Sequence, residues 1–317
     1  MTATMEVAIA PGEQTDMSRR SLDELRGIAV RLSRQILEMT SAAGSGHPSS
    51  SLSAIDLMTG LYFGGILRFN PTEADWPRRD RFILSKGHAA PALYAVLAEA
   101  GYFPAAELKT LRQLGSRLEG HPNRRRLVGV EASTGSLGQG LSIGLGHALA
   151  ARLDHLDYRV YVLLGDGEID EGQVWEASMA AAKYKVDNLT AILDYNEYQQ
   201  TGSVTTVMPS VEPLIDKWEA FGWYVLEIDG HRMEAVVEAL QVARTITQQP
   251  QMIIAHTSKG RNLTPFLAND VNHKHGETLN DTDLAIALAE LDEQKMWELY
   301  SEVADALSPG LEGGLHR

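Results

Sequence analysis

The stretch Leu163-Leu164-Gly165-Asp166-Gly167-Glu168, with Asn196 thirty positions after Asp166, decides the fold. The run 159–164 is apolar and rich in β-branched and aromatic residues, which is typical of a buried parallel strand. A second such run occupies 189–194, and a helix is predicted between the two. Because strands joined by a helix are parallel neighbours, Asp166 and Asn196 are expected side by side. They would lie at the carboxyl edge of the sheet, where open α/β sheets bind ligands.

The side chains at this edge predict a metal site. Asp166 offers a carboxylate and Asn196 an amide oxygen, and both are hard donors that suit Mg²⁺ or Ca²⁺. Two side chains leave an octahedral ion short of ligands, so we expect phosphate oxygens and water to complete the site. The glycines on either side of Asp166 allow a sharp turn and a close approach of the backbone to a ligand.

Composition excludes several classes of protein. The formal charge of −14 argues against a general nucleic-acid or anionic-membrane binder, because neutralising phosphates needs clustered Lys and Arg. The absence of cysteine excludes disulfides, thiolate metal sites, iron–sulfur clusters and thiol nucleophiles. No uninterrupted apolar run of about 18 residues occurs, so no membrane span is expected. Residues 1–17 carry no signal-peptide pattern, and we expect a cytoplasmic protein.

Strands that alternate with helices predict an α/β fold, with a doubly wound, mostly parallel sheet and helices on both faces. We expect a flexible leader over 1–20 and a single domain over 21–317 that ends in a helical extension. Ser21 and Glu24 predict a capping box at the start of the first helix. An irregular loop is expected over 199–213. Three further strands are predicted over 81–84, 223–228 and 251–256. Helices are predicted over 21–40, 51–63, 90–100, 103–114, 141–153, 171–185, 216–221, 233–247 and 281–307.

The glycine-dense segment 135–140 precedes a predicted helix. Its backbone amides and the helix N-terminus could cradle a diphosphate, and close helix packing by small residues is the alternative. The segment does not fit the dinucleotide pattern, because Ile143 stands where the third glycine belongs. No GxxxxGK[ST] sequence occurs, which argues against a P-loop ATPase.

Glycine-flanked histidines recur at His47, His88 and His121. A single one would more often be structural, but three in similar settings favour a shared site. Neutral histidines pass protons or bind oxygens near neutral pH. No HxxxH spacing is present, so a zinc site is not indicated. Glu171 has two interpretations: it caps the predicted helix, or it orders charges near a cofactor.

Taken together, these segments resemble a known family. Gly165-Asp166-Gly167 followed by Asn196 is similar to the thiamine-diphosphate motif. The order and spacing of the other segments resemble the N-terminal half of transketolases, over residues 22–276. These segments are Ser45-Gly46-His47-Pro48, Ser85-Lys86-Gly87-His88-Ala89, Glu119-Gly120-His121-Pro122 and residues 129–140.

The resemblance implies a thiamine diphosphate site with Mg²⁺, for which Ca²⁺ or Mn²⁺ would substitute. Asp166 and Asn196 would hold the metal, joined by the backbone carbonyl of Tyr198. Gly167 and His88 would contact the diphosphate.

The resemblance also implies roles around the cofactor's head and the substrate. Gly135 and Leu137 would line the cofactor near its aminopyrimidine, and Glu171 matches an acid that communicates between two active sites. His275 looks like the late histidine that touches the diphosphate and the substrate, with His273 as the runner-up. Three histidines would surround the substrate's reacting end: His47, His88 and His121.

Two positions depart from the family pattern, and a third departure is the length. Ser49 replaces the commoner glycine and Lys86 an asparagine, and we expect both to be tolerated while altering the substrate mouth. Full transketolases continue into a pyrimidine-binding domain, whose glutamate protonates the aminopyrimidine and drives ylid formation, whereas this chain ends at Arg317. The resemblance therefore implies the N-terminal subunit of a split transketolase. A separate C-terminal subunit would supply that domain and glutamate, in an α₂β₂ assembly.

Three functional hypotheses follow. The first is transfer of a two-carbon ketol unit from a ketose or ketose phosphate to an aldose or aldose phosphate. The second is the α subunit of a 2-oxoacid dehydrogenase, which the histidine motifs disfavour. The third is a non-catalytic homologue, which the intact metal and histidine positions disfavour. The substrate stays open among pentose phosphates, a branched sugar phosphate and a sulfonated sugar.

Overall fold

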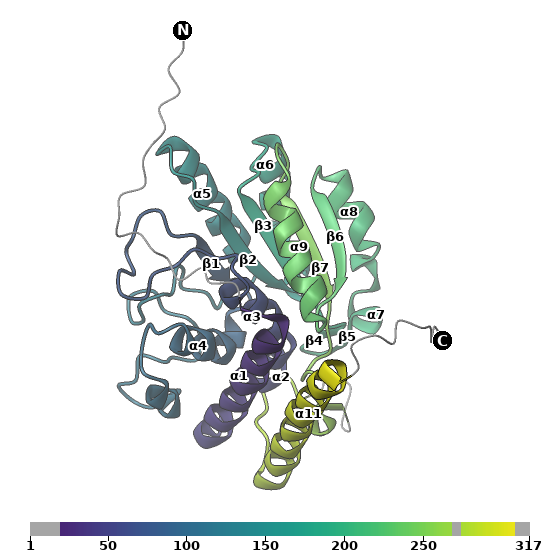
Figure 1. Cartoon of the computed structure of the whole chain (residues 1–317). Coiled ribbons are helices and arrows are strands. Elements are labelled where there is room, and N and C mark those ends of the chain that lie inside the picture. Colours follow the sequence, from purple (N-terminus) through teal and green to yellow (C-terminus); the bar gives the residue numbers. More distant parts are fainter. Residues whose placement is uncertain (1–19, 268–273, 308–317) are drawn as a thin grey trace.

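A computed structural model describes residues 20–267 and 274–307 of the chain, and its centre is a five-stranded parallel sheet (Figure 1). The strand order is β1-β2-β3-β7-β6, and every strand runs parallel to its neighbours. The strands are β1 (Arg81–Leu84), β2 (Val160–Gly165), β3 (Leu189–Tyr195), β6 (Tyr224–Asp229) and β7 (Gln251–His256). All five agree with the strands predicted from the sequence.

Helices cover both faces of the sheet, as the doubly wound prediction requires. Successive side chains of β2 point to opposite faces, so Tyr161 and Leu163 join one apolar core while Val162 and Leu164 join the other. The first core packs against α1 (Leu22–Ala43), α3 (Ile55–Phe63), α4 (Ala90–Glu99) and α9 (Met233–Thr245). The second packs against α5 (Gln139–Leu153), α6 (Gly172–Lys183) and α8 (Leu214–Ala220).

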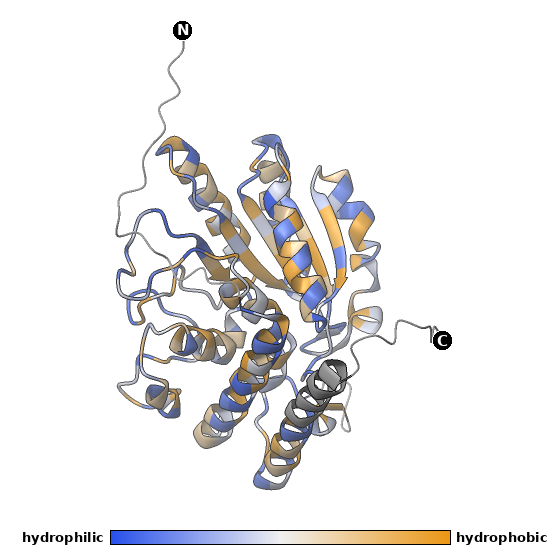
Figure 2. Ribbon diagram, viewed as in Figure 1, coloured by the Kyte–Doolittle hydropathy of each residue, from blue (hydrophilic) through white to orange (hydrophobic). Residues whose placement is uncertain are grey.

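Hydropathy follows this layering (Figure 2). The strands between the two layers are mostly hydrophobic, because a sheet covered on both faces has no solvated side. Helices α1 and α9 carry both hydrophobic and hydrophilic residues. Helix α11 (Asp281–Leu307) lies along α1, where Arg34 pairs with Asp292 across the two helices at 2.6 Å. No helix in the described ranges is long and apolar enough to cross a membrane.

The predicted capping box is confirmed at the start of α1. The Glu24 backbone amide donates to Ser21 Oγ at 3.2 Å, and the Ser21 amide donates to the Glu24 carboxylate at 2.8 Å. Two predicted helices were wrong in detail. The helix expected over 51–63 is two helices, because Pro48 starts α2 (Pro48–Ser53) early and the chain turns at Ala54 before α3.

The helix expected over 103–114 is only a short 3₁₀ segment, η2 (Ala105–Thr110). Helical hydrogen bonding ends there because Arg112 adopts a left-handed φ of 56° and its amide donates to the Leu118 carbonyl instead. The predicted irregular loop over 199–213 contains ordered structure. It pairs β4 (Tyr198–Gln199) with β5 (Gly202–Ser203) and continues through α7 (Val204–Val207) and η4 (Pro209–Val211).

Candidate functional site

Asp166 and Asn196 lie at the carboxyl edge of the sheet, as predicted. The register pairs Gly165 of β2 with Asp194 of β3, so the residues that follow each strand emerge next to one another. Both side chains are buried. Asp166 Oδ1 accepts from the Gly167 amide at 2.8 Å, whereas Asp166 Oδ2 has no hydrogen-bond partner within the described ranges. A buried carboxylate oxygen without a donor is free to bind a cation.

A cavity of about 350 Å³ opens above this edge and brings together the predicted site residues. His273 lies outside the described residues. Glu171 is not among the residues that line this cavity. It is the N-cap of α6, is exposed, and packs against Gly138. The cavity is lined by His47, Ser50, Lys86, His88, His121, Gly135, Leu137, Gly165, Asp166, Gly167, Glu168, Asn196, Tyr198, Gln199, Gln200, Thr201 and His275.

Three of the histidines form a triangle inside the cavity. The ring centroids of His47, His88 and His275 are 5.2 to 5.3 Å apart. His121 is exposed at the rim, where its ring lies so close to Gly135 that a Cβ on that glycine would sit 3.4 Å from it. These histidines come from four separate segments of the chain. The fold brings them to one cavity, as their similar settings in the sequence predicted.

The cavity keeps its histidines neutral. Burial, aided by nearby cations, lowers the pKa of His47 to about 4 and that of His275 to about 3. Burial also holds the pKa of His88 well below its usual value. A neutral imidazole carries one donor and one acceptor nitrogen, so near pH 7 the cluster can hydrogen-bond hydroxyl groups and pass protons.

Glu168 is a site residue that the sequence reasoning missed. Its buried carboxylate accepts hydrogen bonds from the hydroxyl of Ser85, from the Gly138 amide at 2.9 Å and from the Gly165 amide at 3.0 Å. One side chain thus ties together three loops that line the cavity. Glu168 belongs to the stretch 163–168, but only the fold shows that its carboxylate contacts the glycine-dense segment 135–140.

Lys259 is a second residue that the sequence reasoning missed. It follows β7, so it reaches the same sheet edge as Asp166. Its ammonium donates to the Tyr198 carbonyl at 3.4 Å and lies 2.9 Å from His275 Nδ1. Burial lowers the pKa of Lys259 to about 8. The order of strands could have suggested this position, because β7 is the neighbour of β3.

The two departures from the family pattern are both buried side chains, and their effect on the substrate mouth stays a prediction. Lys86 lines the cavity but is only 1 % exposed, and its ammonium pairs with buried Asp194. The Asp194 carboxylate also accepts from Ser53 at 2.6 Å and from Thr257. Ser49 is fully buried, and its carbonyl accepts from the Gly260 amide.

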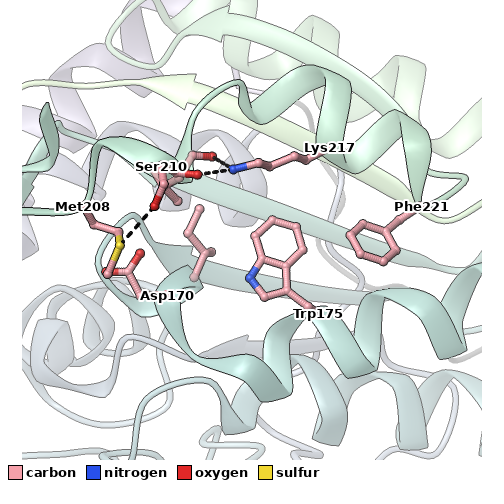
Figure 3. Close-up of a pocket in the computed structure, with 8 residues that line it drawn as sticks. Asp170, Trp175, Met208, Ser210, Lys217 and Phe221 are labelled. Carbon is pink, nitrogen blue, oxygen red and sulfur yellow. Dashed lines mark hydrogen bonds between the residues drawn. The ribbon is translucent and has the colours of Figure 1, made fainter.

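A second pocket, of about 370 Å³, lies between α6, η4 and α8 (Figure 3). Its wall is aromatic, with the Trp175 and Phe221 rings 5.5 Å apart. Its charged groups are already paired within the fold, because Lys217 donates to the carbonyls of Ser210 and Val211, and Asp170 accepts from Gln199. The histidine cavity is therefore the better candidate for chemistry.

Comparison with known proteins agrees with this geometry. The family described as "Transketolase, thiamine diphosphate binding domain" matches residues 28–313. The chain belongs to this transketolase family. The fold agrees as well: transketolase from Campylobacter jejuni superposes with a TM-score of 0.77 at 32% identity, covering 87% of this chain and 45% of that one.

Transketolase relatives fall into two lengths. The 6-deoxy-6-sulfo-D-fructose transketolase subunit SqwG of Clostridium sp. strain MSTE9 is 42% identical over 278 residues, which cover 88% of this chain and 99% of the relative. Transketolase from Pongo abelii is 42% identical over 286 residues, which cover 90% of this chain and 43% of the relative. The chain thus spans less than half of the long transketolases and nearly all of the short subunit.

Proposed function

We propose that this chain is the N-terminal subunit of a transketolase, which binds thiamine diphosphate with a divalent metal and moves a two-carbon ketol unit from a ketose to an aldose. The observation that carries the proposal is the shared cavity. It gathers the unpartnered Asp166 oxygen and the neutral histidines around one space. A site of this form suits an anionic cofactor held by metal and a polyhydroxylated substrate held by imidazoles.

The residues present fit the metal. Asp166 Oδ2, the amide oxygen of Asn196 and the backbone carbonyl of Tyr198 are hard oxygen donors at one sheet edge. No cluster of three or more His, Asp or Glu side chains in the described part of the chain could hold a metal by itself. A partial oxygen set leaves octahedral positions for diphosphate oxygens and water, which favours Mg²⁺, with Ca²⁺ or Mn²⁺ as substitutes.

The residues present also fit the cofactor's anionic tail. Gly167 offers a close backbone approach, and a side chain there would crowd Gln199, whose Cγ lies 3.1 Å from the position of a Cβ. His88 would contact the diphosphate beside it, while Gly135 and Leu137 would line the aminopyrimidine side. When bound, thiamine diphosphate supplies the carbanion that attacks and cleaves next to a carbonyl.

The histidines would manage the substrate's hydroxyl groups. His47, His88 and His121 would surround the reacting end, and His275 would reach both the substrate and the diphosphate. Because burial keeps His47 and His275 neutral, each offers a ring nitrogen that can accept a hydrogen bond from a substrate hydroxyl group.

The carboxylates that line the cavity are a reason to expect a second subunit. Asp166 and Glu168 are the carboxylates that line its described part, and Glu168 is saturated by three donors of the fold. Glu168 is thus engaged by the fold and Asp166 would be engaged by the metal, so neither would protonate an aminopyrimidine. A C-terminal subunit with a pyrimidine-binding domain would bring that glutamate, in an α₂β₂ assembly where exposed Glu171 could communicate between sites.

The substrates would be sugars or sugar phosphates. The similarity to a 6-deoxy-6-sulfo-D-fructose transketolase subunit supports a sulfonated ketose as donor, beside pentose phosphates and branched sugar phosphates. The test is to assay the purified chain, alone and with the co-expressed C-terminal subunit, for ketol transfer with a donor from each class. We expect turnover only in the mixture. Robust turnover by the chain alone, or none from any donor in the mixture, would contradict the proposal.

A further inference from the structure

We propose that Arg112 is a positioning residue, which holds the His47 loop and the His121 loop in place at the substrate end of the cavity. The inference deepens the proposed function, because it concerns the histidines that would handle the substrate's hydroxyl groups. Arg112 does not line the cavity. It acts through the two loops that carry these histidines.

The guanidinium of Arg112 joins the two loops directly. Its Nη1 donates to Ser45 Oγ at 2.8 Å, two residues before His47. Its Nη2 donates to the Gly120 carbonyl at 3.3 Å, one residue before His121. A guanidinium presents several N–H groups in a rigid plane, so one side chain can fix two acceptors at once, which a lysine ammonium does less well.

The backbone around Arg112 is shaped for this contact. The left-handed φ of 56° at Arg112 and the hydrogen bond from its amide to the Leu118 carbonyl fold the segment back. Gly120 leaves room for the guanidinium, because a Cβ there would lie only 3.1 to 3.2 Å from its atoms. The turn at Arg112, which replaces the predicted helix, therefore also places the guanidinium between the two histidine loops.

The charge of Arg112 acts on both histidines. After burial, Arg112 is the largest cause that lowers the pKa of His47, ahead of His121, Lys259 and Lys86. It lowers the pKa of His121 as well, although exposure at the rim weakens the effect. The imidazoles of His88 and His275 also lie against the His47 ring, and Glu119 stands two residues before His121 in the chain.

Glu119 does not cancel this effect, because its carboxylate is engaged elsewhere. One oxygen pairs with Arg126 at 3.4 Å, and the other accepts from Asn123 at 3.0 Å. The hydroxyl of Tyr94 donates to the carbonyls of Glu119 and His121 and so braces the same loop. Arg112 thus favours the neutral, proton-accepting form of both histidines.

Two variants separate the contact from the charge. Arg112→Lys keeps the charge but has a single ammonium that cannot span both loops, and Arg112→Met removes charge and contact. Arg117→Met is the matched control, because Arg117 lies on the same segment but pairs with Glu107 at 2.9 Å instead of a histidine loop. Each variant is measured as the full chain and as the complex with the C-terminal subunit.

The first measurement is an NMR pH titration of the imidazoles in the full chain, with His47→Gln and His121→Gln used to identify their signals. We expect Arg112→Met to move the His47 midpoint clearly to higher pH and the His121 midpoint by less. Arg112→Lys and Arg117→Met should leave both midpoints in place. Unmoved midpoints in Arg112→Met would overturn the electrostatic half of the proposal, and this readout needs no turnover.

The second measurement is ketol transfer by the complex. Both Arg112 variants should lower kcat/KM about tenfold or more, since small misplacements of catalytic groups are costly. The Kd for thiamine diphosphate should stay within about threefold. Only Arg112→Met should shift the acid limb of the pH profile upward. Values of kcat/KM within twofold of the parent in both variants, or a loss explained by weaker cofactor binding, would overturn the proposal. Absence of turnover in the parent complex would count against the proposed function alone.

Discussion

The two ends of the cavity are built in different ways. The diphosphate end comes from one strand–helix–strand unit, in which β2 and β3 set Asp166 and Asn196 side by side through regular pairing. The histidine end comes from four loops that are distant in sequence and carry His47, His88, His121 and His275. Pairing of buried strands is cooperative and hard to shift, whereas loops depend on individual contacts, each worth about 0.5–1.5 kcal/mol.

At the histidine end, side-chain hydrogen bonds and ion contacts between loops fix the positions of the site residues, as strand pairing does at the diphosphate end. Glu168 ties the glycine segment to the Ser85 loop, Arg112 ties the His47 loop to the His121 loop, and Lys259 ties His275 to Tyr198. Loss of a metal ligand should therefore abolish cofactor binding, while loss of one polar link or of the rim histidine should reduce affinity or turnover in graded steps. Four predictions test this difference.

The largest effect is expected from Asp166→Ala. The change removes the unpartnered buried oxygen proposed as a metal ligand, so binding of thiamine diphosphate that depends on Mg²⁺ should weaken at least about 100-fold. Isothermal titration with and without Mg²⁺ measures this. Asp170→Ala is the control, because Asp170 is an exposed acid on the same turn. Unchanged binding in Asp166→Ala would refute the metal assignment.

His121→Ala should reduce turnover strongly and cofactor binding weakly. His121 lines the cavity at an exposed position and is proposed to surround the substrate's reacting end, so kcat should fall about 100-fold, as expected for loss of a proton-transfer group. The Kd for thiamine diphosphate should change by less than about threefold. Steady-state kinetics and cofactor titration of the complex separate the two quantities. The opposite pattern would move His121 to the cofactor.

Glu168→Gln tests whether buried polar links hold the loops. An amide nitrogen would face backbone donors where a carboxylate oxygen now accepts, so the free energy of unfolding should fall by about 2–4 kcal/mol. Cofactor affinity should fall about tenfold with it. Urea unfolding and cofactor titration measure both. Glu176→Gln, on the exposed face of α6, should behave like the parent, and equal stability of the two variants would contradict the role of Glu168.

The smallest effect is a pH dependence of stability. The folded-state pKa of His47, about 4, lies below its usual 6.5, so between these values the unfolded chain binds more protons. Stability contributed by neutral His47 should therefore be lost as pH falls from about 6.5 toward 4. In His47→Gln this loss should be smaller, as measured by thermal unfolding across that range. His155→Gln, at an exposed position, should keep the parent's full pH dependence.

Prediction from sequence succeeded where the signal is local. The parallel strands, the Ser21–Glu24 capping box and the neighbourhood of Asp166 and Asn196 follow from hydrophobic runs and chain connectivity. Prediction failed at 103–114 because apolar spacing suggests a helix, while Arg112 adopts a left-handed φ, its amide bonds to Leu118, and its side chain reaches Ser45, 67 positions away. The pairing of Lys86 with Asp194 could not be predicted either, because the two residues are 108 positions apart.

The sequence by itself determined the fold class, the sheet edge at which Asp166 and Asn196 meet and the membership of the histidines in one site, because periodicity and motif order are carried by neighbouring residues. Tertiary structure decided how the histidines are oriented and kept neutral. It also decided which carboxylate is free and which is used by the fold: Asp166 keeps an unpartnered oxygen while Glu168 is fully bonded. The physical reason is that burial and hydrogen-bond partners set the chemistry of a polar group, and both depend on segments distant in sequence.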